Sequence, residues 1–394
     1  MNVFGYFKGD RVIWMIVLLL SLLSLAAVYS SIVTLAYKHH DGDTEYYLFK
    51  HLRIILLGLV LMFLTHRIKY SYFSRISQLM LIASVPLLLY TLASGTNLNE
   101  ASRWIAIPGT GLTFQTSDFA KLALIMYLAR VLTQKQGEMN DFKTVLIHIM
   151  IPVGLVCVLI LPANFSTAAL LFLTSMILMF IGGVKIKYIG GVIGLGIAAF
   201  GLLLCIAMVK PGLLPRVDTW VQRIETFFGI GNAADIPPDS DKTFQQDQAK
   251  IAIATGGILG KGAGNSTQRN FLPHPYSDFI YAMVIEEYGL VGGIVIVILY
   301  LILLFRGVRV STKSDRTFGQ LLAFGLAFQL IFQGLINMAV AVNLFPVTGQ
   351  PLPFLSMGGT SLLFSSIAVG IILSISRETD ETDGTVEGGR LAAT

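Results

Sequence analysis

Apolar residues fill the chain in long runs that are separated by shorter polar segments. Each run is long enough to cross a hydrocarbon core of about 30 Å as a helix. The runs are continuous rather than alternating, which favours helices over the strands of a membrane barrel. The pattern predicts an all-α polytopic membrane protein with about ten transmembrane helices, at residues 12–36, 50–66, 76–94, 116–133, 143–161, 165–183, 188–209, 277–305, 318–342 and 356–376.

Positive charges divide unevenly between the segments that join these runs. If the N-terminus lies inside, the short outside segments carry only Lys38, Lys50, Arg53 and Arg103. The inside segments then carry Lys8, Arg11, Arg67, Lys69, Arg75, Arg130, Lys135, Lys143, Lys185, Lys187, Arg306, Arg309, Lys313, Arg316 and Arg377. Because lysine and arginine accumulate in cytoplasmic loops, both termini are expected in the cytoplasm.

The remaining connections define the expected domain organisation. Residues 1–377 form a single transmembrane domain, and residues 210–276 form a long extracytoplasmic loop between the seventh and eighth spans. The tail 378–394 is acidic and lacks apolar periodicity, so we expect a disordered cytoplasmic segment. The first apolar run is too long for the core of a signal peptide and is expected to be retained.

Composition supports the membrane assignment and removes two other classes. Only 13% of the residues are charged, against about 25% in soluble globular proteins. The net charge of +5 is explained by the lysines and arginines of the inside loops, so no nucleic acid is expected as a partner. Cys157 and Cys205 both lie in apolar runs, which argues against a disulfide framework or a metal site.

Three carboxylates occur at the head of the eighth span, within FLPHPYSDFIYAMVIEEYG (residues 271–289). Asp278 follows Ser277, and one interpretation is that it caps the helix. Glu286 and Glu287 lie about 12–13 Å further along the helix axis. Carboxylates at membrane depth are functional candidates, although structural ion pairing is the alternative for these three.

A second cluster of polar residues lies in residues 101–129. Arg103 and Trp104 fall in an outside segment, where an aromatic ring can sit at the membrane interface. Asp118 and Lys121 are three residues apart, share a helix face and can pair. One interpretation is that the pair only lowers the cost of inserting its helix into the membrane. The other is that it joins Arg53 in an outward-facing site for an anionic group such as a lipid-linked pyrophosphate.

Two segments contain the residues that break regular helices. The run GGILGKGAG (residues 256–264) lacks the Lys-Ser/Thr ending of a phosphate loop, so its glycines are expected to let irregular backbone approach a ligand or helix ends. Residues 337–364 contain Pro346, Pro351 and Pro353, which interrupt a helix. Such a segment is tolerated at membrane depth where it is buried or lines a wet cavity; a plain interhelical loop is the alternative.

These clusters together resemble the SEDS family (shape, elongation, division, sporulation), the RodA/FtsW-type peptidoglycan glycosyltransferases. The resemblance spans nearly the whole chain to Arg377 and is carried by four motifs in order. They are RWI followed by FQTSDFAKLA, then GGILGKGAGNSTQ, SDFIYAMVIEEYG, and PVTGQPLPFLSMGGTS. The PVTGQPLPF and MGGTS segments favour the division branch over the elongation branch.

The resemblance implies polymerisation of lipid II into glycan strands at the outer face of the bacterial cytoplasmic membrane. It assigns the catalytic carboxylate to Asp278. The residues implied in substrate binding are Arg53, Arg103, Trp104, Lys121 and Asp118. The residues implied in support are Glu286, Glu287, Asn164, Gln248 and Ser356.

Two positions depart from the family pattern. Asp118 stands where the family usually has glutamate, which keeps the charge and shortens the reach. The family usually reads P-D-x-G-T at the start of the sixth span, whereas this chain reads PANFST from residue 162. If Asn164 occupies the aspartate position, a neutral amide replaces one expected carboxylate, and the network around Lys121 depends more on Asp118.

The reaction implied by the family is attack of a sugar 4-hydroxyl on an anomeric carbon that carries a lipid pyrophosphate. A positioned carboxylate such as Asp278 can act as the general base, with inversion at that carbon. The leaving group needs positive charge from Arg53, Arg103 or Lys121, or from a divalent cation, Mg²⁺ or Mn²⁺. No organic cofactor is expected.

The expected partners follow from the same resemblance. They are lipid II and the growing glycan strand, a class B penicillin-binding protein that crosslinks the strands, other division or elongation proteins, and membrane lipid. The alternatives are a lipid II flippase, which needs polar groups that continue to the cytoplasmic side, and a division scaffold without activity.

Overall fold

The computed structural model describes residues 8–33, 35, 37, 43–94, 96–98, 101–107, 112–209, 217, 220–221, 227, 241–272 and 275–392. The side chains at 94, 96–98, 101–103, 106–107, 112, 206–209, 241–243 and 382–392 lie outside this description. The α-helices are α1 (Arg11–Ser31), α3 (Thr44–Arg67), α4 (Ser71–Ser94), α5 (Thr116–Gln134), α6 (Phe142–Val145), α7 (Ile151–Ile160), α8 (Phe165–Ile181), α9 (Ile186–Val209), α11 (Asp241–Gly256), α12 (Ile280–Lys313), α13 (Thr317–Ala341) and α14 (Gly359–Ala392).

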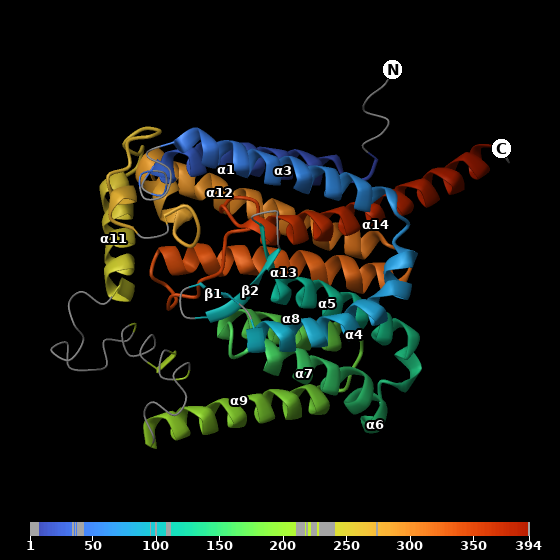
Figure 1. The fold of residues 1–394 in the computed structure, drawn as a ribbon. Coiled ribbons are helices and arrows are strands. Elements are labelled where there is room, and N and C mark those ends of the chain that lie inside the picture. Colours follow the sequence, from blue (N-terminus) through green and yellow to red (C-terminus); the bar gives the residue numbers. More distant parts are fainter. Residues whose placement is uncertain are drawn as a thin grey trace.

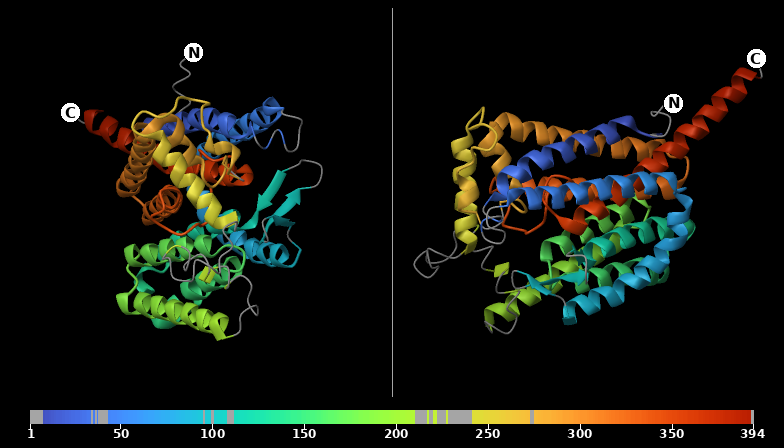
Figure 2. Two further views of the ribbon diagram at one scale, coloured as in Figure 1. Left: turned by 90° about the vertical axis from the view of Figure 1, so that its left-hand side faces the viewer. Right: turned by 45° about the horizontal axis from the view of Figure 1, so that its top comes forward.

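The long helices run side by side in one bundle, and α11 lies across one end of it (Figure 1). Helices α13 and α14 form the centre, since 78% of the most apolar window of each is buried. The corresponding share for α9 is 6%, and α9 lies at the edge of the bundle (Figures 1 and 2). An apolar helix that is exposed in this way needs lipid as its solvent, as the sequence predicts.

Eight of the described helices are long and apolar enough to cross a membrane. They are α1, α3, α4, the continuous rod of α6, a π turn (Leu146–Met150) and α7, and then α9, α12, α13 and α14. Helices α5 and α8 occupy the predicted fourth and sixth spans, but α8 has only 17 residues. The all-α membrane fold is therefore confirmed, while the count of ten spans stays a prediction.

The two ends of the bundle differ as the charge pattern predicts. The start of α1 and the end of α14 lie at one end of the bundle, and α11 lies at the other (Figure 1). The segment from residue 378, for which we expect disorder, continues α14 as a helix to Ala392. A helix that is already nucleated in the bundle extends at little further cost, even through a polar sequence. Lys8 also holds Glu381 of this extension at 2.9 Å.

Helix α12 is interrupted at Gly289, whose φ of 72° lies in the left-handed region. The glycine-rich segment fills the interruption. Its backbone supplies four hydrogen bonds that replace those of a continuous helix: Lys261 N to Glu286 O (2.9 Å), Gly262 N to Glu287 O (2.9 Å), Leu290 N to Gly257 O (2.9 Å) and Val291 N to Ile258 O (3.3 Å). A Cβ at Gly289 would collide with the carbonyl oxygen of Ile258. The prediction that these glycines allow close backbone approach is confirmed.

A three-stranded antiparallel sheet, which the sequence analysis did not predict, precedes α5. Its strands are β1 (Thr96–Leu98), β2 (Ala101–Ile107) and β3 (Leu112–Gln115). Trp104 on β2 pairs with Gln115 on β3, and the backbone N–H of Gln115 donates to Oγ1 of Thr360 at 3.1 Å. Strand β3 leads directly into α5, so the sheet and α14 fix where α5 begins.

Candidate functional site

Asp278 lies in a turn immediately before α12 and is partly buried. Oγ of Ser277 donates a hydrogen bond to its carboxylate at 2.9 Å. The N-cap of α12 is Phe279, which makes no side-chain capping bond. Asp278 is one residue too early to cap the helix, so its carboxylate is not committed to the helix end.

Helix α13 contacts the turn that carries Asp278 (residues 275–279, the Asp278 turn). Nδ2 of Asn337 donates to the carbonyl oxygen of Asp278 at 2.9 Å and to that of Gln350 at 2.7 Å. Oγ of Ser356 donates to the carbonyl oxygen of Ser277 at 2.6 Å. Ser356 is one of the predicted supporting residues. Together with Asn337 it fixes the peptide groups before and after Asp278, which carries the carboxylate.

Lys121 and Asp118 form the ion pair expected from their spacing. Nζ of Lys121 lies 2.7 Å from Oδ1 of Asp118, and the two side chains are 11% and 4% exposed. Nζ also donates to Oε1 of Gln333 at 3.0 Å. Gln333 precedes Asn337 by four residues on α13, so Lys121 and the Asp278 turn are anchored to one face of this helix about 6 Å apart along its axis.

Several polar atoms between these anchors remain unpaired among the described residues. Oδ2 of Asp118, Oδ1 of Asn337 and both side-chain polar atoms of Gln350 are buried without a hydrogen-bond partner in the described part of the chain. A cavity of about 40 Å³, lined in part by Asp118, Lys121 and Gln333, lies beside the ion pair. It is large enough for one water molecule. Unpaired buried polar atoms are costly. Here one of them belongs to the ion pair, and those of Asn337 and Gln350 lie next to the backbone of Asp278.

A second hydrogen-bonded chain reaches the same region from α1 and α3. His51 is 1% exposed, and its Nε2 lies 2.8 Å from Oγ of Ser24. Ser24 in turn donates to the carbonyl oxygen of Leu355, the residue before Ser356, at 2.8 Å. The broken segment that contains Pro351 and Pro353 is thus bonded to α1, α13 and the Asp278 turn. It is buried in protein, as a non-helical segment at membrane depth must be.

Glu286 is fully buried and accepts hydrogen bonds from the glycine-rich segment. Its carboxylate pairs with Nζ of Lys261 at 2.6 Å. The other donors are Oγ of Ser266, the backbone N–H (3.0 Å) and Oγ1 (2.9 Å) of Thr267, and the backbone N–H of Gln268 (3.3 Å). Glu286 therefore orders residues 261–268 rather than facing the Asp278 turn.

Glu287 connects the same part of α12 to α1. Its carboxylate, 3% exposed, accepts a hydrogen bond from Oγ of Ser30. Nη1 of Arg269 donates to the carbonyl oxygen of Ser30 at 3.2 Å and to that of Gly264 at 2.9 Å. Both glutamates thus have structural contacts with loop or helix neighbours.

Four further predicted residues lie on α3, β2 and α11. Arg53 is exposed and its Nε donates to the carbonyl oxygen of Phe49 at 3.3 Å. Arg103 lies on β2, but its side chain lies outside the described residues. Trp104 is half-buried on β2, and Gln248 is half-buried on α11.

Asn164 has a clear local role. It is the N-cap of α8, and its side chain accepts a hydrogen bond from the backbone N–H of Thr167 at 3.2 Å. Asparagine and aspartate cap helices about equally well, so the amide preserves the cap without the charge. Asn164 also lies at the edge of an apolar cavity of about 630 Å³ between α8, α9 and α13, lined in part by Phe200, Trp220 and Phe332.

Sequence reasoning missed the polar residues of α13. Gln329, Gln333 and Asn337 recur every four residues in an otherwise apolar span, which places them on one helix face. Oε1 of Gln329 accepts a hydrogen bond from Oγ1 of Thr174 at 2.7 Å. Polar side chains at this spacing in a membrane helix are a readable signal of an interior polar site.

A metal site built from the protein alone is not present among the described residues, which contain no group of three or more histidine, cysteine, aspartate or glutamate side chains able to hold an ion. Asp278 offers a partly exposed carboxylate, which is an oxygen ligand of the kind that Mg²⁺ and Mn²⁺ prefer. Mg²⁺ is often held by one or two carboxylates together with phosphate oxygens of a substrate. The Asp278 carboxylate alone supplies too few ligands. A divalent cation therefore fits this site only when phosphate oxygens of a bound substrate supply further ligands.

Comparisons with known proteins agree on one family. The model of the FtsW/RodA/SpoVE family, described as cell cycle protein, matches residues 10–381. The chain is 34% identical over 375 residues to the "Probable peptidoglycan glycosyltransferase FtsW" of Trichlorobacter lovleyi, with 93% of each chain covered. It is 30% identical over 372 residues to the stage V sporulation protein E of Bacillus subtilis, covering 93% of this chain and 97% of that protein.

Solved structures give the same fold. A chain of a peptidoglycan synthase complex, studied for the structural coordination of polymerization and crosslinking, superposes with a TM-score of 0.71 at 23% identity. That match covers 94% of this chain and 98% of the other. The rod shape determining protein RodA of Thermus thermophilus superposes with a TM-score of 0.66 at 22% identity, covering 94% and 97%. At these identities the likeness shows the fold.

Proposed function

Because the chain belongs to the FtsW/RodA/SpoVE family, we propose that it is a peptidoglycan glycosyltransferase that polymerises lipid II at the outer face of the bacterial cytoplasmic membrane. Relatives at 31–35% identity over most of the chain carry the name "Probable peptidoglycan glycosyltransferase FtsW". The observation that carries the proposal is the common anchoring of Asp278 and Lys121 on α13 through Asn337 and Gln333.

The proposed role of Asp278 is that of general base. The 4-hydroxyl of the acceptor sugar forms a bond to the anomeric carbon of the donor, and the bond from that carbon to the pyrophosphate oxygen breaks. The hydroxyl proton goes to the Asp278 carboxylate, and attack from the opposite face inverts the anomeric carbon. A positioned base of this kind contributes about 10²–10⁴-fold to the rate. Asn337 and Ser356 keep the carboxylate in place by holding the peptide backbone around it.

The leaving pyrophosphate requires positive charge, and Lys121 is the proposed source on the protein. Its ammonium is largely shielded from water, where electrostatic stabilisation is stronger than in bulk solvent. Arg53 and Arg103 are further candidates on the same predicted face of the membrane. A divalent cation, if bound, would be held mainly by the substrate's phosphate oxygens, and it would neutralise charge on the leaving group.

The apolar cavity between α8, α9 and α13 is the proposed place for part of the lipid chain. Most of the residues that line it are apolar. Its few polar residues are Asn164, Ser166 and Thr348. Transfer of an isoprenoid chain into such a space is favourable for the same reason that burial of any apolar surface is. Helix α9 closes one side of the cavity through Phe200.

The polar face of α13 favours polymerisation over transport. Its hydrogen-bonding side chains extend from Asn337 to Gln329. The next turns toward the end that carries the chain termini present Gly325, Leu326 and Leu322 on the same side. A flippase needs a polar path that continues across the membrane, and this helix does not offer one.

We place the protein in the division branch, with a class B penicillin-binding protein as its partner and the growing glycan strand as its product. One of the structural neighbours is a synthase complex in which polymerization and crosslinking are coordinated. The single transmembrane domain of residues 1–377 would then supply polymerisation, and the partner would supply crosslinking.

The test is lipid II polymerisation by the purified protein together with its partner. Asp278→Asn removes the base and keeps the shape, so we expect strand formation to fall by at least about a hundredfold. Asp247→Asn, on the exposed face of α11, is the matched control and is expected to retain full activity. Strands of normal length and yield from Asp278→Asn would refute the general-base role. Absence of polymer from the wild-type complex, together with transbilayer movement of lipid II, would favour the flippase instead.

A further inference from the structure

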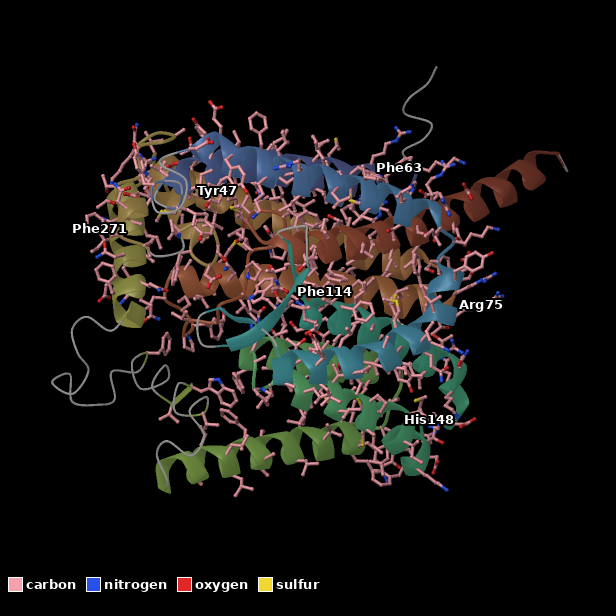
Figure 3. The ribbon with its side chains drawn as sticks, viewed as in Figure 1. Tyr47, Phe63, Arg75, Phe114, His148 and Phe271 are labelled. Atoms are coloured by element: carbon pink, nitrogen blue, oxygen red, sulfur yellow. The ribbon has the colours of Figure 1, made fainter. Side chains whose placement is uncertain are left out.

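A cavity at the end of the bundle opposite α11 is lined by three arginines. It has a volume of about 280 Å³ and lies between α4, α5 and the start of α13. Arg75, Arg130 and Arg316 line it together with Tyr70, Ser71, Ser74, Gln134 and Phe318. Figure 3 shows Arg75 at the end of the bundle from which the C-terminal helix extends, away from Phe271 at the other end. The charge pattern of the loops assigns this end to the cytoplasm.

None of the three guanidinium groups forms an ion pair with a carboxylate in the described part of the chain. Nη1 of Arg130 donates to the carbonyl oxygens of Ser74 (2.6 Å) and Arg75 (3.3 Å), and its Nε donates to Oε1 of Gln134 (3.3 Å). Arg75 lies over the ring of Tyr72 at 5.7 Å. These contacts orient Arg130 and Arg75. Two carboxylates lie close to Tyr70 at the edge of the cavity, those of Asp315 and of Glu378, which accepts a hydrogen bond from the backbone N–H of Tyr70 at 3.0 Å. The three arginines outnumber them, so the cavity keeps an excess of positive charge.

Three like charges around one cavity repel one another, and an anion between them removes that repulsion. Guanidinium groups present paired N–H donors that match the oxygens of a phosphate group. Tyr70, Ser71 and Ser74 line the same cavity, and serine hydroxyl groups are neutral donors that can supplement the guanidinium groups. The chemistry of the lining is therefore that of a phosphate site.

The surface next to the cavity is suited to acyl chains. From Arg75, positions 79, 82, 86 and 89 lie on one side of α4 and read leucine, isoleucine, proline and leucine. Leu79, Ile82 and Leu89 are 69%, 61% and 51% exposed. This apolar stripe begins at the cavity and runs along the outside of the bundle, where lipid covers it. A ligand with a phosphate group and two hydrocarbon chains matches both features.

We propose that Arg75, Arg130 and Arg316 form a binding site for the phosphate headgroup of an anionic phospholipid in the cytoplasmic leaflet, with its acyl chains along the outer side of α4. Basic pockets between transmembrane helices on the cytoplasmic side are a recognised form of lipid site. The bound lipid would join the inner ends of α4, α5 and α13. The proposal does not depend on the glycosyltransferase activity.

The test measures lipid retained by the purified full-length protein. The protein is extracted from vesicles that contain phosphatidylglycerol and phosphatidylcholine, and bound lipids are counted by native mass spectrometry. We expect selective retention of phosphatidylglycerol and about fivefold weaker binding for each arginine replaced by glutamine. The double variant Arg75→Gln/Arg316→Gln changes two exposed side chains, and Arg316→Gln alone repeats the test with one.

The control variant Lys185→Gln/Lys187→Gln removes the same charge at the same end of the bundle but away from the cavity. It is expected to bind phosphatidylglycerol within twofold of the wild type. Equal losses in both double variants, or no loss in Arg75→Gln/Arg316→Gln, would overturn the site. Competition with inorganic phosphate separates the two sources of a phosphate group: displacement of the lipid by millimolar phosphate would overturn the lipid assignment.

Discussion

Replacement of Glu286 by glutamine tests how the loop of residues 257–272 is held on α12. The carboxylate accepts hydrogen bonds from Lys261, Ser266, Thr267 and Gln268, and it is fully buried. Glutamine has nearly the same shape, but its amide nitrogen would meet donors instead of offering an acceptor. The ammonium of Lys261 also loses its counter-charge.

The expected cost follows from these contacts. Removal of one partner of a buried ion pair typically costs about 3–5 kcal/mol. The Lys261 side chain is 26% exposed, so water partly compensates the lost charge. We therefore expect the free energy of loop opening to fall by about 2–3 kcal/mol. Most of this change comes from the backbone N–H groups of Thr267 and Gln268, which lose their acceptor.

Hydrogen exchange of peptides that cover residues 257–272 measures this opening directly. A cost of 2–3 kcal/mol corresponds to roughly 30–150-fold faster exchange of the protected amides. The control is Glu138→Gln, which removes an exposed pair with Lys135 at 2.8 Å and is expected to change exchange by less than about fivefold. An unchanged rate at residues 266–268 in Glu286→Gln would refute the reasoning, because the loop would then be held without the carboxylate.

Three further substitutions test other parts of the structure. Asn164→Ala should lower the free energy of unfolding by about 1 kcal/mol, while Asn164→Asp should leave the melting temperature in detergent nearly unchanged, since both native and variant side chains cap α8. Gly289→Ala should reduce the yield of folded protein sharply, because a Cβ there meets the Ile258 carbonyl at a left-handed φ; a normal yield would contradict the described path of the loop. Asn337→Leu should lower kcat for lipid II polymerisation about tenfold or more with little change in KM, because it frees the Asp278 peptide; a change in KM alone would indicate a role in binding.

Local spacing allowed the correct prediction of several contacts. Asp118 and Lys121 are three residues apart, and helix geometry alone brings their charges together. The glycines around Gly260 signalled close backbone approach, which the structure contains. The alternative that Asp278 caps α12 was wrong by one residue, because the helix begins at Ile280 after Phe279. Helix boundaries are the least certain part of any sequence-based reading.

Contacts between distant segments could not be predicted in the same way. Glu286 binds residues about twenty positions earlier, and nothing in the local pattern indicates which loop residues reach a buried carboxylate. The small sheet of residues 96–115 has short strands whose pairing depends on the turn between them and on Thr360. In contrast, the four-residue spacing of Gln329, Gln333 and Asn337 was visible in the sequence, and only their partners required the structure.

The interruption of α12 bears on the order in which the chain assembles. Until the segment around Gly257 arrives, the amides of Leu290 and Val291 have no acceptor at a break within an apolar helix, and unpaired backbone groups in lipid cost several kcal/mol each. The helix is therefore expected to enter the membrane unbroken, and the break at Gly289 forms only when the loop docks. Maturation of the outer end, including the turn that carries Asp278, is then a late step that follows insertion of the eighth span.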